Sequence, residues 1–262
     1  MIAFQHSGRQ GDILYSLPAC IERSRGLPFD FHLHTNRRDD HDPSNRGVMQ
    51  TYEEAEFLAS LLREQPYIRN LTISDNDCVP ARDVSTYVDL DRFREVPDMY
   101  CFTEIRSWYK RVMDVKLNHL DQPWITVPPT EQPTSSKICI CFTERYQPAI
   151  DPNALKPFAN DLMFIGLPKE HKRFCSMYFS VDYRPVKSLK ELLQYVSKSK
   201  GWVSNICGSY AAMEGAAIPR VLCVPPAGGD VRAYTPHGKC IIDNAKLVKS
   251  LEALLSTTSL AK

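Results

Sequence analysis

SLKELLQYVSKSKGWVSNICGSYAAMEGAAIPRVLCVPP (residues 188–226) decides the fold of this 262-residue chain. Leucines at helical spacing predict an amphipathic helix over 188–199, which opens with the capping-box pattern Ser-Leu-Lys-Glu. The short apolar segments 201–206 and 220–226 predict strands, and the small residues between them predict a second helix. Helix, strand, helix and strand in this order are typical of an α/β layer structure with a parallel sheet.

The same alternation extends through the rest of the chain. Segments with strand character lie at 1–6, 29–35, 70–75, 86–91, 137–142, 162–168 and 178–183, and segments with helical periodicity lie at 13–24, 51–65, 99–115, 169–178 and 244–256. We therefore expect an α/β fold in both halves of the sequence.

A stretch rich in Pro, Ser and Thr, VPPTEQPTSSK, separates the two halves. We expect an N-terminal Rossmann-like domain over 1–126, a linker over 127–136 and a C-terminal Rossmann-like domain over 137–262. The final helix could also return to pack on the N-terminal domain. Ligands of doubly wound sheets bind at the carboxyl ends of the strands, so the two domains are expected to face a central cleft.

The composition is that of a globular protein, with 43% hydrophobic and 24% charged residues. This balance excludes a disordered chain, a collagen-like fibre and a small disulfide scaffold. A net charge of +1 gives no indication of nucleic-acid binding through bulk charge, although it leaves room for a local basic patch.

The N-terminus, MIAFQHSGRQGD, lacks the basic and then apolar regions of a signal peptide. No stretch approaches the roughly 18–20 apolar residues of a transmembrane helix. The nine cysteines include no CxxC pair, and Cys139 and Cys141 alternate along an apparent strand, which favours core packing over a zinc site. We therefore expect a cytoplasmic protein with reduced thiols.

Three segments contain residues suited to chemistry. In SGRQGDILYSLPA (7–19), Gly8 and Gly11 allow a ligand close to the backbone before a helix. Asp12 could cap that helix, or it could act as a general base that takes a proton from an attacking hydroxyl. The spacing of this segment matches neither a Walker A loop nor GxGxxG.

The other two segments lie in the second half. In FIGLPKEH (164–171), Glu170 could accept hydrogen bonds from ribose hydroxyls, or it could be an exposed carboxylate favoured by a helix dipole. After the strand that ends at Ser204 and Asn205, the small residues Gly208 and Ser209 would let a diphosphate approach a helix N-terminus. Close packing of helix on sheet requires the same small residues.

Together these segments resemble a known family. GDILYSLPA (11–19) is similar to the glycine–aspartate–leucine–proline motif of ADP-heptose:lipopolysaccharide heptosyltransferases, and FIGLPKEH resembles their glycine–proline–x–glutamate segment. The stretch 188–219 resembles their sugar-nucleotide segment, and the three occur in the expected order. The resemblance implies the GT-B architecture of two Rossmann-like domains, with a nucleotide-sugar donor in the second and an acceptor mainly in the first.

The resemblance also implies roles for individual residues. Asp12 matches the catalytic base, and Arg145 would stabilise the departing diphosphate without a metal. The donor site would comprise Gly8, Arg9, Gly11, Thr143, Glu170, Asn205, Gly208, Ser209 and Glu214.

The sequence departs from the family pattern in the sugar-nucleotide segment. Ile206 and Cys207 stand where the family usually has an acid and then Ser or Thr, and Ala211 stands in place of a histidine. Glu214, in Met-Glu-Gly, resembles instead the glutamate that binds donor ribose or sugar in other GT-B enzymes. The departures leave open a nucleotide-sugar-binding protein of the same fold with impaired turnover.

Other readings remain. Asp40-His41-Asp42 is a DxD pattern of the kind that holds a divalent metal, and His32 and His34 lie on one face of a nearby strand. A phage-type GT-B enzyme that glycosylates DNA would need a basic surface. The candidates for that surface are Arg37, Arg38, Arg46, Lys110 and Arg111. A GT-B-type epimerase is a more distant alternative.

The expected activity is transfer of a sugar from a nucleotide-sugar to an acceptor hydroxyl, with no metal and no cofactor. The acceptor could be a glycan, a lipid-linked saccharide or a modified nucleic acid. Peripheral contact with a membrane stays open, because lipid-linked acceptors lie at its surface.

Overall fold

The computed structural model describes residues 2–38, 47–74, 87–95, 104–118, 121–226 and 231–256. Its internal contacts divide the chain into two compact units. One comprises Met1–Leu120 and Trp124–Thr126, and the other comprises Asp121–Pro123 and Val127–Lys262. The two are called the N-terminal and C-terminal units below.

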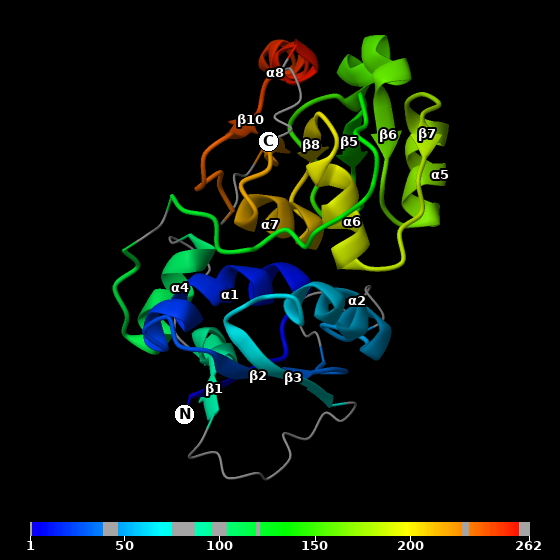
Figure 1. Cartoon of the computed structure of the whole chain (residues 1–262). Coiled ribbons are helices and arrows are strands. Elements are labelled where there is room, and N and C mark those ends of the chain that lie inside the picture. Colours follow the sequence, from blue (N-terminus) through cyan, green and yellow to red (C-terminus); the bar gives the residue numbers. More distant parts are fainter. Residues whose placement is uncertain are drawn as a thin grey trace. The chain divides into compact units, whose positions relative to one another are not determined.

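The N-terminal unit contains a four-stranded parallel sheet in the order β3-β2-β1-β4. Figure 1 shows α1 and α2 along one face of this sheet. Its strands are β1 (Ala3–His6), β2 (Phe29–His34), β3 (Ile68–Ser74) and β4 (Tyr87–Asp89). Its helices are α1 (Gln10–Arg23), α2 (Tyr52–Leu62), the 3-10 helix η1 (Leu90–Glu95) and α4 (Ile105–Met113).

The core of this unit combines aromatic side chains of the sheet with aliphatic side chains of α1. Phe4 and Phe29 on neighbouring strands are fully buried, and their rings meet edge to face at 4.9 Å. Leu14 and Leu17 of α1 are also completely buried, as the helical periodicity predicts. The sequence placed Asp12 at the N-cap of this helix, and that placement is wrong by three residues, because the helix begins at Gln10.

The C-terminal unit contains a six-stranded parallel sheet in the order β10-β9-β8-β5-β6-β7. Its strands are β5 (Ile138–Cys141), β6 (Leu162–Phe164), β7 (Asp182–Tyr183), β8 (Gly201–Ser204), β9 (Arg220–Cys223) and β10 (Gly238–Ile241). Its helices are the 3-10 helix η2 (Pro152–Asp161), α5 (Pro168–Met177), α6 (Leu189–Ser197), α7 (Gly208–Gly215) and α8 (Asn244–Ser256). Counted within the unit, this is the strand order of a Rossmann fold.

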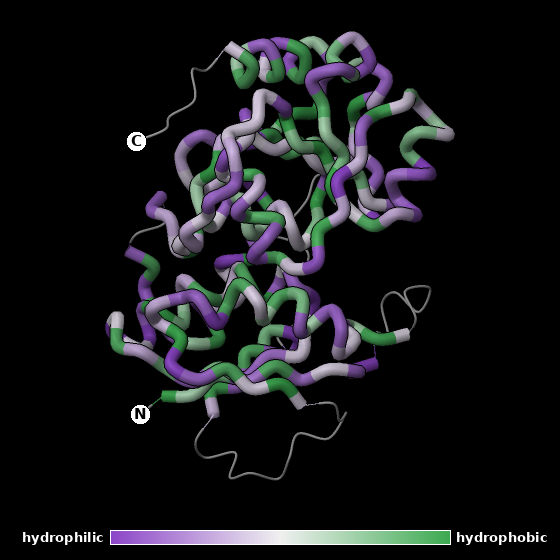
Figure 2. The backbone as a smooth tube through the Cα atoms, turned by 45° about the vertical axis from the view of Figure 1, so that its right-hand side comes forward, coloured by the Kyte–Doolittle hydropathy of each residue, from purple (hydrophilic) through white to green (hydrophobic). Residues whose placement is uncertain are grey.

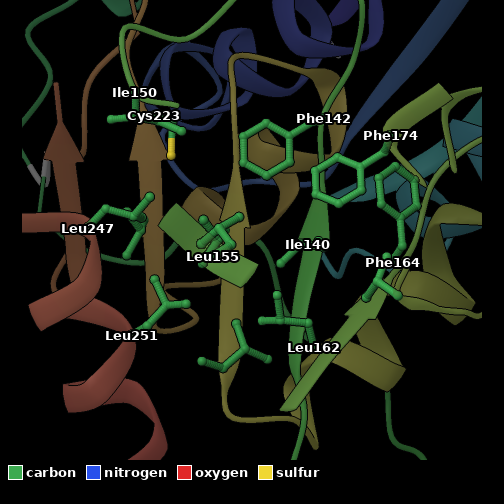
Figure 3. Packing of buried hydrophobic residues seen from close by; sticks show 14 of the residues in the cluster. Ile140, Phe142, Ile150, Leu155, Leu162, Phe164, Phe174, Cys223, Leu247 and Leu251 are labelled. Atoms are coloured by element: carbon green, nitrogen blue, oxygen red, sulfur yellow. The ribbon is translucent and has the colours of Figure 1, made fainter. Parts of the chain in front are cut away.

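The core of the C-terminal unit follows from the two-residue period of its strands. Ile138 and Ile140 point to the face covered by η2, α5 and α8, where Phe164 and Phe174 also lie (Figure 3). Cys139 and Cys141 alternate with these isoleucines and are buried, which confirms that they pack in the core.

The last helix, α8, packs within the C-terminal unit. Figure 2 shows hydrophobic and hydrophilic residues alternating around it near the C-terminus. Its apolar side chains Leu247 and Leu251 are fully buried in the core shared with η2 and β5. The buried face of this helix therefore belongs to the core of the C-terminal unit.

Several details differ from the sequence expectations. The strand β10 and both 3-10 helices were not expected, because they lack strong periodicity. At α6, the Ser188 hydroxyl accepts from the Glu191 amide at 3.1 Å as predicted. The Glu191 carboxylate, however, accepts from the backbone N–H of Lys187 at 2.8 Å and does not complete the capping box.

Seven of the nine cysteines lie in the described part of the chain, and all seven are free thiols. Among the described helices, none combines the length and apolarity needed to cross a bilayer.

Candidate active site

The strand order reverses at one point in each unit, and ligands of open parallel sheets bind at the carboxyl ends of strands beside such points. In the N-terminal unit the reversal lies between β1 and β4, and in the C-terminal unit it lies between β5 and β8. The segment 8–12 follows β1, Thr143 and Arg145 follow β5, and 205–209 follows β8. Glu170 lies just beyond β6.

Asp12 is the third residue of α1, and its carboxylate is restrained from two sides. Its Oδ2 accepts from the backbone N–H of Arg9 at 3.2 Å, which satisfies one of the unpaired donors at the start of the helix. The same oxygen accepts from the guanidinium of Arg94 at 3.2 Å. The Asp12 side chain keeps 22% of its surface exposed, so it can still be reached from solvent.

Gly8 is required by the crowding around this carboxylate. A Cβ atom there would lie 2.6 Å from His6 Cε1, 2.9 Å from an Arg94 nitrogen and 2.9 Å from Asp12 Oδ2. Any side chain would therefore displace the Asp12 carboxylate or the Arg94 guanidinium. Gly11 lies in the first turn of the helix and is half-buried.

The sequence did not reveal Asp91, which anchors the site. Asp91 lies in η1 and accepts from both the backbone N–H and the hydroxyl of Ser7, at 2.8 and 2.7 Å. It also pairs with Arg94 at 3.4 Å, with Arg37 at 3.4 Å and with His6 at 3.3 Å. Asp91 thus ties the loop after β1 to the segment after β4 and holds the arginine that contacts Asp12.

The surroundings of Asp91 favour its ionised form. Burial alone raises the pKa of this carboxyl, but the His6 ring, the hydrogen bonds from His6 and Ser7, and the Arg94 charge outweigh it and hold the pKa well below its ordinary value. A carboxyl with a depressed folded-state pKa stabilises the fold above its unfolded pKa of about 4, and this stability is lost as the pH falls further.

We therefore expect Asp91→Asn to lower the free energy of unfolding by about 2 kcal/mol at pH 7, because charged hydrogen bonds are lost. The difference from the wild type should shrink as the pH falls below about 4, because the carboxyl of the unfolded wild-type chain then takes up a proton while that of the folded protein stays ionised. Urea unfolding at pH 7 and at lower pH measures both values. Asp114→Asn, at an exposed left-handed C-cap that suits asparagine, is the control. A deficit that stays constant down to pH 2 would contradict the ionised role of Asp91.

In the C-terminal unit, Asn205 joins the two loops at the reversal point. It is completely buried, and its Oδ1 accepts from the backbone N–H of Thr143 at 3.0 Å. Its Nδ2 donates to the carbonyls of Thr143 and Tyr146 at 2.9 and 2.5 Å. The hydrogen-bonding groups of the Asn205 amide are thus used within the protein. Asn205 therefore positions the two loops, in place of the expected contact with the donor.

Glu170 and Thr143 line one surface pocket together with Phe142, Phe174 and Arg173. The Glu170 carboxylate accepts from the backbone N–H of Leu167 at 3.0 Å and so caps α5. Burial raises the pKa of this carboxyl, and the hydrogen bond from Leu167 opposes the shift. The carboxylate of Glu170 and the side chain of Thr143 thus lie close together at the carboxyl edge of the sheet, beside the buried rings of Phe142 and Phe174.

Gly208 and Ser209 form the first turn of α7, as predicted, and both are partly exposed. The backbone N–H groups of a first helical turn have no partner within the helix and favour an anion. Cys207 is the N-cap, and its sulfur accepts from the Tyr210 amide at 3.4 Å. Ile206 and Ala211, the departures from the family pattern, are buried.

The proposal that Glu214 contacts the donor does not fit the structure. The side chain is completely buried and forms an ion pair with Arg220, which is also inaccessible. Its Oε1 accepts from the backbone N–H groups of Tyr234 and Thr235 at 2.8 and 2.6 Å, and Arg220 Nε donates to Oε2 at 2.7 Å. Glu214 therefore holds the segment before β10 against α7.

The remaining predicted residues lie as follows. The Arg145 side chain is exposed, and its guanidinium lies over the Tyr146 ring at 4.8 Å. Arg37 of the predicted basic surface stays partly exposed and also donates to Ser7 Oγ at 3.0 Å. Lys110 and Arg111 are on α4, and Arg38 forms an isolated β-bridge with Val48.

The DxD pattern and Arg46 lie outside the described residues. The rings of His32 and His34 meet edge to face at 4.3 Å, and His32 contacts the Thr72 hydroxyl at 2.5 Å. Within the described ranges, no three His, Cys, Asp or Glu side chains are grouped closely enough to hold a metal ion.

No protein-family model matches the sequence, and no curated protein matches it. Solved structures do share its fold. A glycosyl transferase of family 9 from Veillonella parvula DSM 2008 superposes with a TM-score of 0.64 and 10% identity, over 97% of this chain and 96% of that one. The E. coli heptosyltransferase WaaC, solved with ADP, gives a TM-score of 0.61 and 11% identity over 97% and 99% of the two chains.

The E. coli ADP-heptose lps heptosyltransferase II gives a TM-score of 0.60 and 13% identity over 97% and 98% of the two chains. These matches extend over nearly the whole of each chain, so they include both parallel sheets. The chain therefore has the α/β GT-B fold, with two Rossmann-like sheets, that it shares with these heptosyltransferases.

Proposed function

We propose that the chain is a glycosyltransferase that moves a sugar from a nucleotide-sugar to an acceptor hydroxyl without a metal. The observation that carries the proposal is the position of Asp12, a partly exposed carboxylate at the carboxyl end of β1 in a GT-B fold. Two structures of WaaC contain ADP and ADP-2-deoxy-2-fluoro heptose, which supports a nucleoside diphosphate as the leaving group here.

In this proposal the acceptor hydroxyl donates its proton to Asp12 while its oxygen attacks the anomeric carbon of the donor. The bond from that carbon to the diphosphate breaks, and negative charge develops on the leaving phosphate. Arg145 and the backbone N–H groups of Gly208 and Ser209 would stabilise that charge. Thr143 would contact the donor phosphates, and Glu170 would accept hydrogen bonds from the donor ribose.

A screen of nucleoside diphosphates and nucleotide-sugars by thermal unfolding tests donor binding. A ligand at one hundred times its Kd adds about 2.7 kcal/mol to the stability of the folded state and raises the melting temperature. Glu170→Gln should reduce this shift. Glu191→Gln, which changes another helix-capping carboxylate of the same unit, should leave it unchanged. If no compound of either class raises the melting temperature, donor binding is excluded.

A binding protein without turnover is the second candidate. It is favoured by the burial of Ile206 and Ala211 and by the ion pair of Glu214, because none of these can supply the family's missing acid and histidine. Such a protein would be stabilised by a nucleotide-sugar and would release no nucleoside diphosphate from it. Measuring that release separates the two functions.

A further inference from the structure

Two thiols lie together at the reversal point of the C-terminal sheet. Cys141 is the last residue of β5, and the β5–β8 register places it opposite Ser204. Cys207 lies three residues after Ser204 and is the N-cap of α7. Both thiols flank Ser204, because Cys141 is paired with it across the sheet and the Cys207 sulfur lies 3.7 Å from its hydroxyl. Neither thiol has a part in the function proposed above.

The surroundings of Cys207 are polar. Its sulfur lies 3.1 Å from Ser209 Oγ and 3.7 Å from Ser204 Oγ, and it accepts from the Tyr210 amide at 3.4 Å. The residue is partly exposed, whereas Cys141 is only 4% exposed. Cys207 is therefore the more accessible residue of the pair.

These contacts also favour the thiolate of Cys207. The neighbouring Cys141 thiol lowers the pKa of Cys207 to about 7, against the opposing effect of burial, and the contacts with Ser209 and the Tyr210 amide contribute further. The same interaction and burial raise the pKa of Cys141 well above its ordinary value. One thiol is thus available as a nucleophile at neutral pH, and its neighbour retains its proton.

We infer that Cys207 is an oxidation-sensitive modification site for hydroperoxides, with Cys141 as the thiol that resolves it into a disulfide. The Cys207 sulfur attacks one oxygen of hydrogen peroxide, the O–O bond breaks, and the other oxygen leaves as water after it takes up a proton. Cys207 is then a sulfenic acid. The sulfur of Cys141 attacks it, an S–S bond forms, and the sulfenic oxygen leaves as a second water with the Cys141 proton. The two thiols supply the two electrons that the peroxide gains.

Cys139, Cys223 and Cys240 lack this combination of features. Cys139 and Cys223 are fully buried, and burial raises the pKa of each to about 12. Cys240 is exposed, but partial desolvation raises its pKa also. At pH 7 a larger fraction of Cys207 than of Cys139 or Cys223 is in the reactive thiolate form. We therefore expect an alkylating reagent to modify Cys207 at least about tenfold faster than Cys139 or Cys223.

The test treats the full chain with excess hydrogen peroxide, blocks the remaining thiols and maps tryptic peptides by mass spectrometry without reduction. Cleavage after Lys137, Arg145, Lys200 and Arg220 separates the two thiols onto peptides 138–145 and 201–220. We expect these two peptides to be joined, with the loss of two hydrogen atoms, and to separate on treatment with dithiothreitol.

Matched variants identify the sulfur atoms. Cys139→Ala changes the other cysteine of peptide 138–145 and should leave the link intact. Cys207→Ser, which keeps a side chain suited to an N-cap, and Cys141→Ala should each abolish it. In Cys141→Ala, the reagent dimedone should trap the sulfenic acid on Cys207. Circular dichroism verifies that each variant is folded. Absence of the linked peptides in the folded wild type, or their persistence in Cys141→Ala, would overturn the inference.

Discussion

Asp12→Asn should lower kcat for sugar transfer by about 10³-fold and leave the affinity for the donor nearly unchanged. An amide cannot take the proton of the acceptor hydroxyl, and general base catalysis typically contributes a factor of 10² to 10⁴. The variant should fold, because the amide oxygen can still accept from the Arg9 N–H or the Arg94 guanidinium, which lie 3.2 Å from the present carboxylate. Initial rates of nucleoside diphosphate release, with the donor and acceptor saturating, measure the effect.

The matched control is Asp30→Asn. Asp30 lies near the amino end of β2, where it pairs with Arg69 on the neighbouring strand, so it is at the opposite edge of the same sheet from Asp12. Its replacement should leave kcat within about twofold of the wild type, since a surface ion pair contributes little. Near-full transfer activity in Asp12→Asn would remove the proposed base, and equal losses in both variants would indicate a general structural defect.

The elements with strong periodicity were predictable. Completely buried parallel strands such as β5 and β8 read as short apolar runs, and α2 and α6 open with recognisable caps. Local patterns of this kind determine most of the sheet. By contrast, η1 has no such pattern, and its position depends on contacts with β1 that are distant in the sequence.

The candidate site was predictable only where its residues follow strands. Asp12, Thr143 and Glu170 lie at the carboxyl ends of strands because the parallel sheet places them there. Asp91 and Arg94 were not found, because a pairing across about 80 residues leaves no local signal. They hold the loop after β1 and the proposed base, so the missed residues are the ones that fix the geometry of the site.

At Glu214 the sequence suggested a functional residue where the structure has a structural one. The glutamate that resembled a ligand contact forms a buried ion pair with Arg220. Glu214→Gln keeps the shape of the side chain but leaves the charge of Arg220 without a counter-ion in a fully inaccessible position. We expect a loss of 3–5 kcal/mol in the free energy of unfolding of the C-terminal unit, the typical cost of removing one partner from a buried pair. Urea unfolding measures this loss.

The two roles of Glu214 predict different results for a second variant. If the carboxylate serves the fold, replacing its partner as well should restore stability, because the charge no longer needs compensation; Glu214→Gln with Arg220→Met should lose less than the sum of the two single variants. If the carboxylate serves a ligand, Glu214→Gln should weaken donor binding at unchanged stability. Glu252→Gln, an exposed carboxylate on α8, should change the free energy of unfolding by less than about 0.5 kcal/mol. Arg220 also donates to the carbonyls of Ile218 and Thr235, so it could hold this segment without Glu214. If the loss in the double variant equals the sum of the losses in the two single variants, the structural role of Glu214 is refuted.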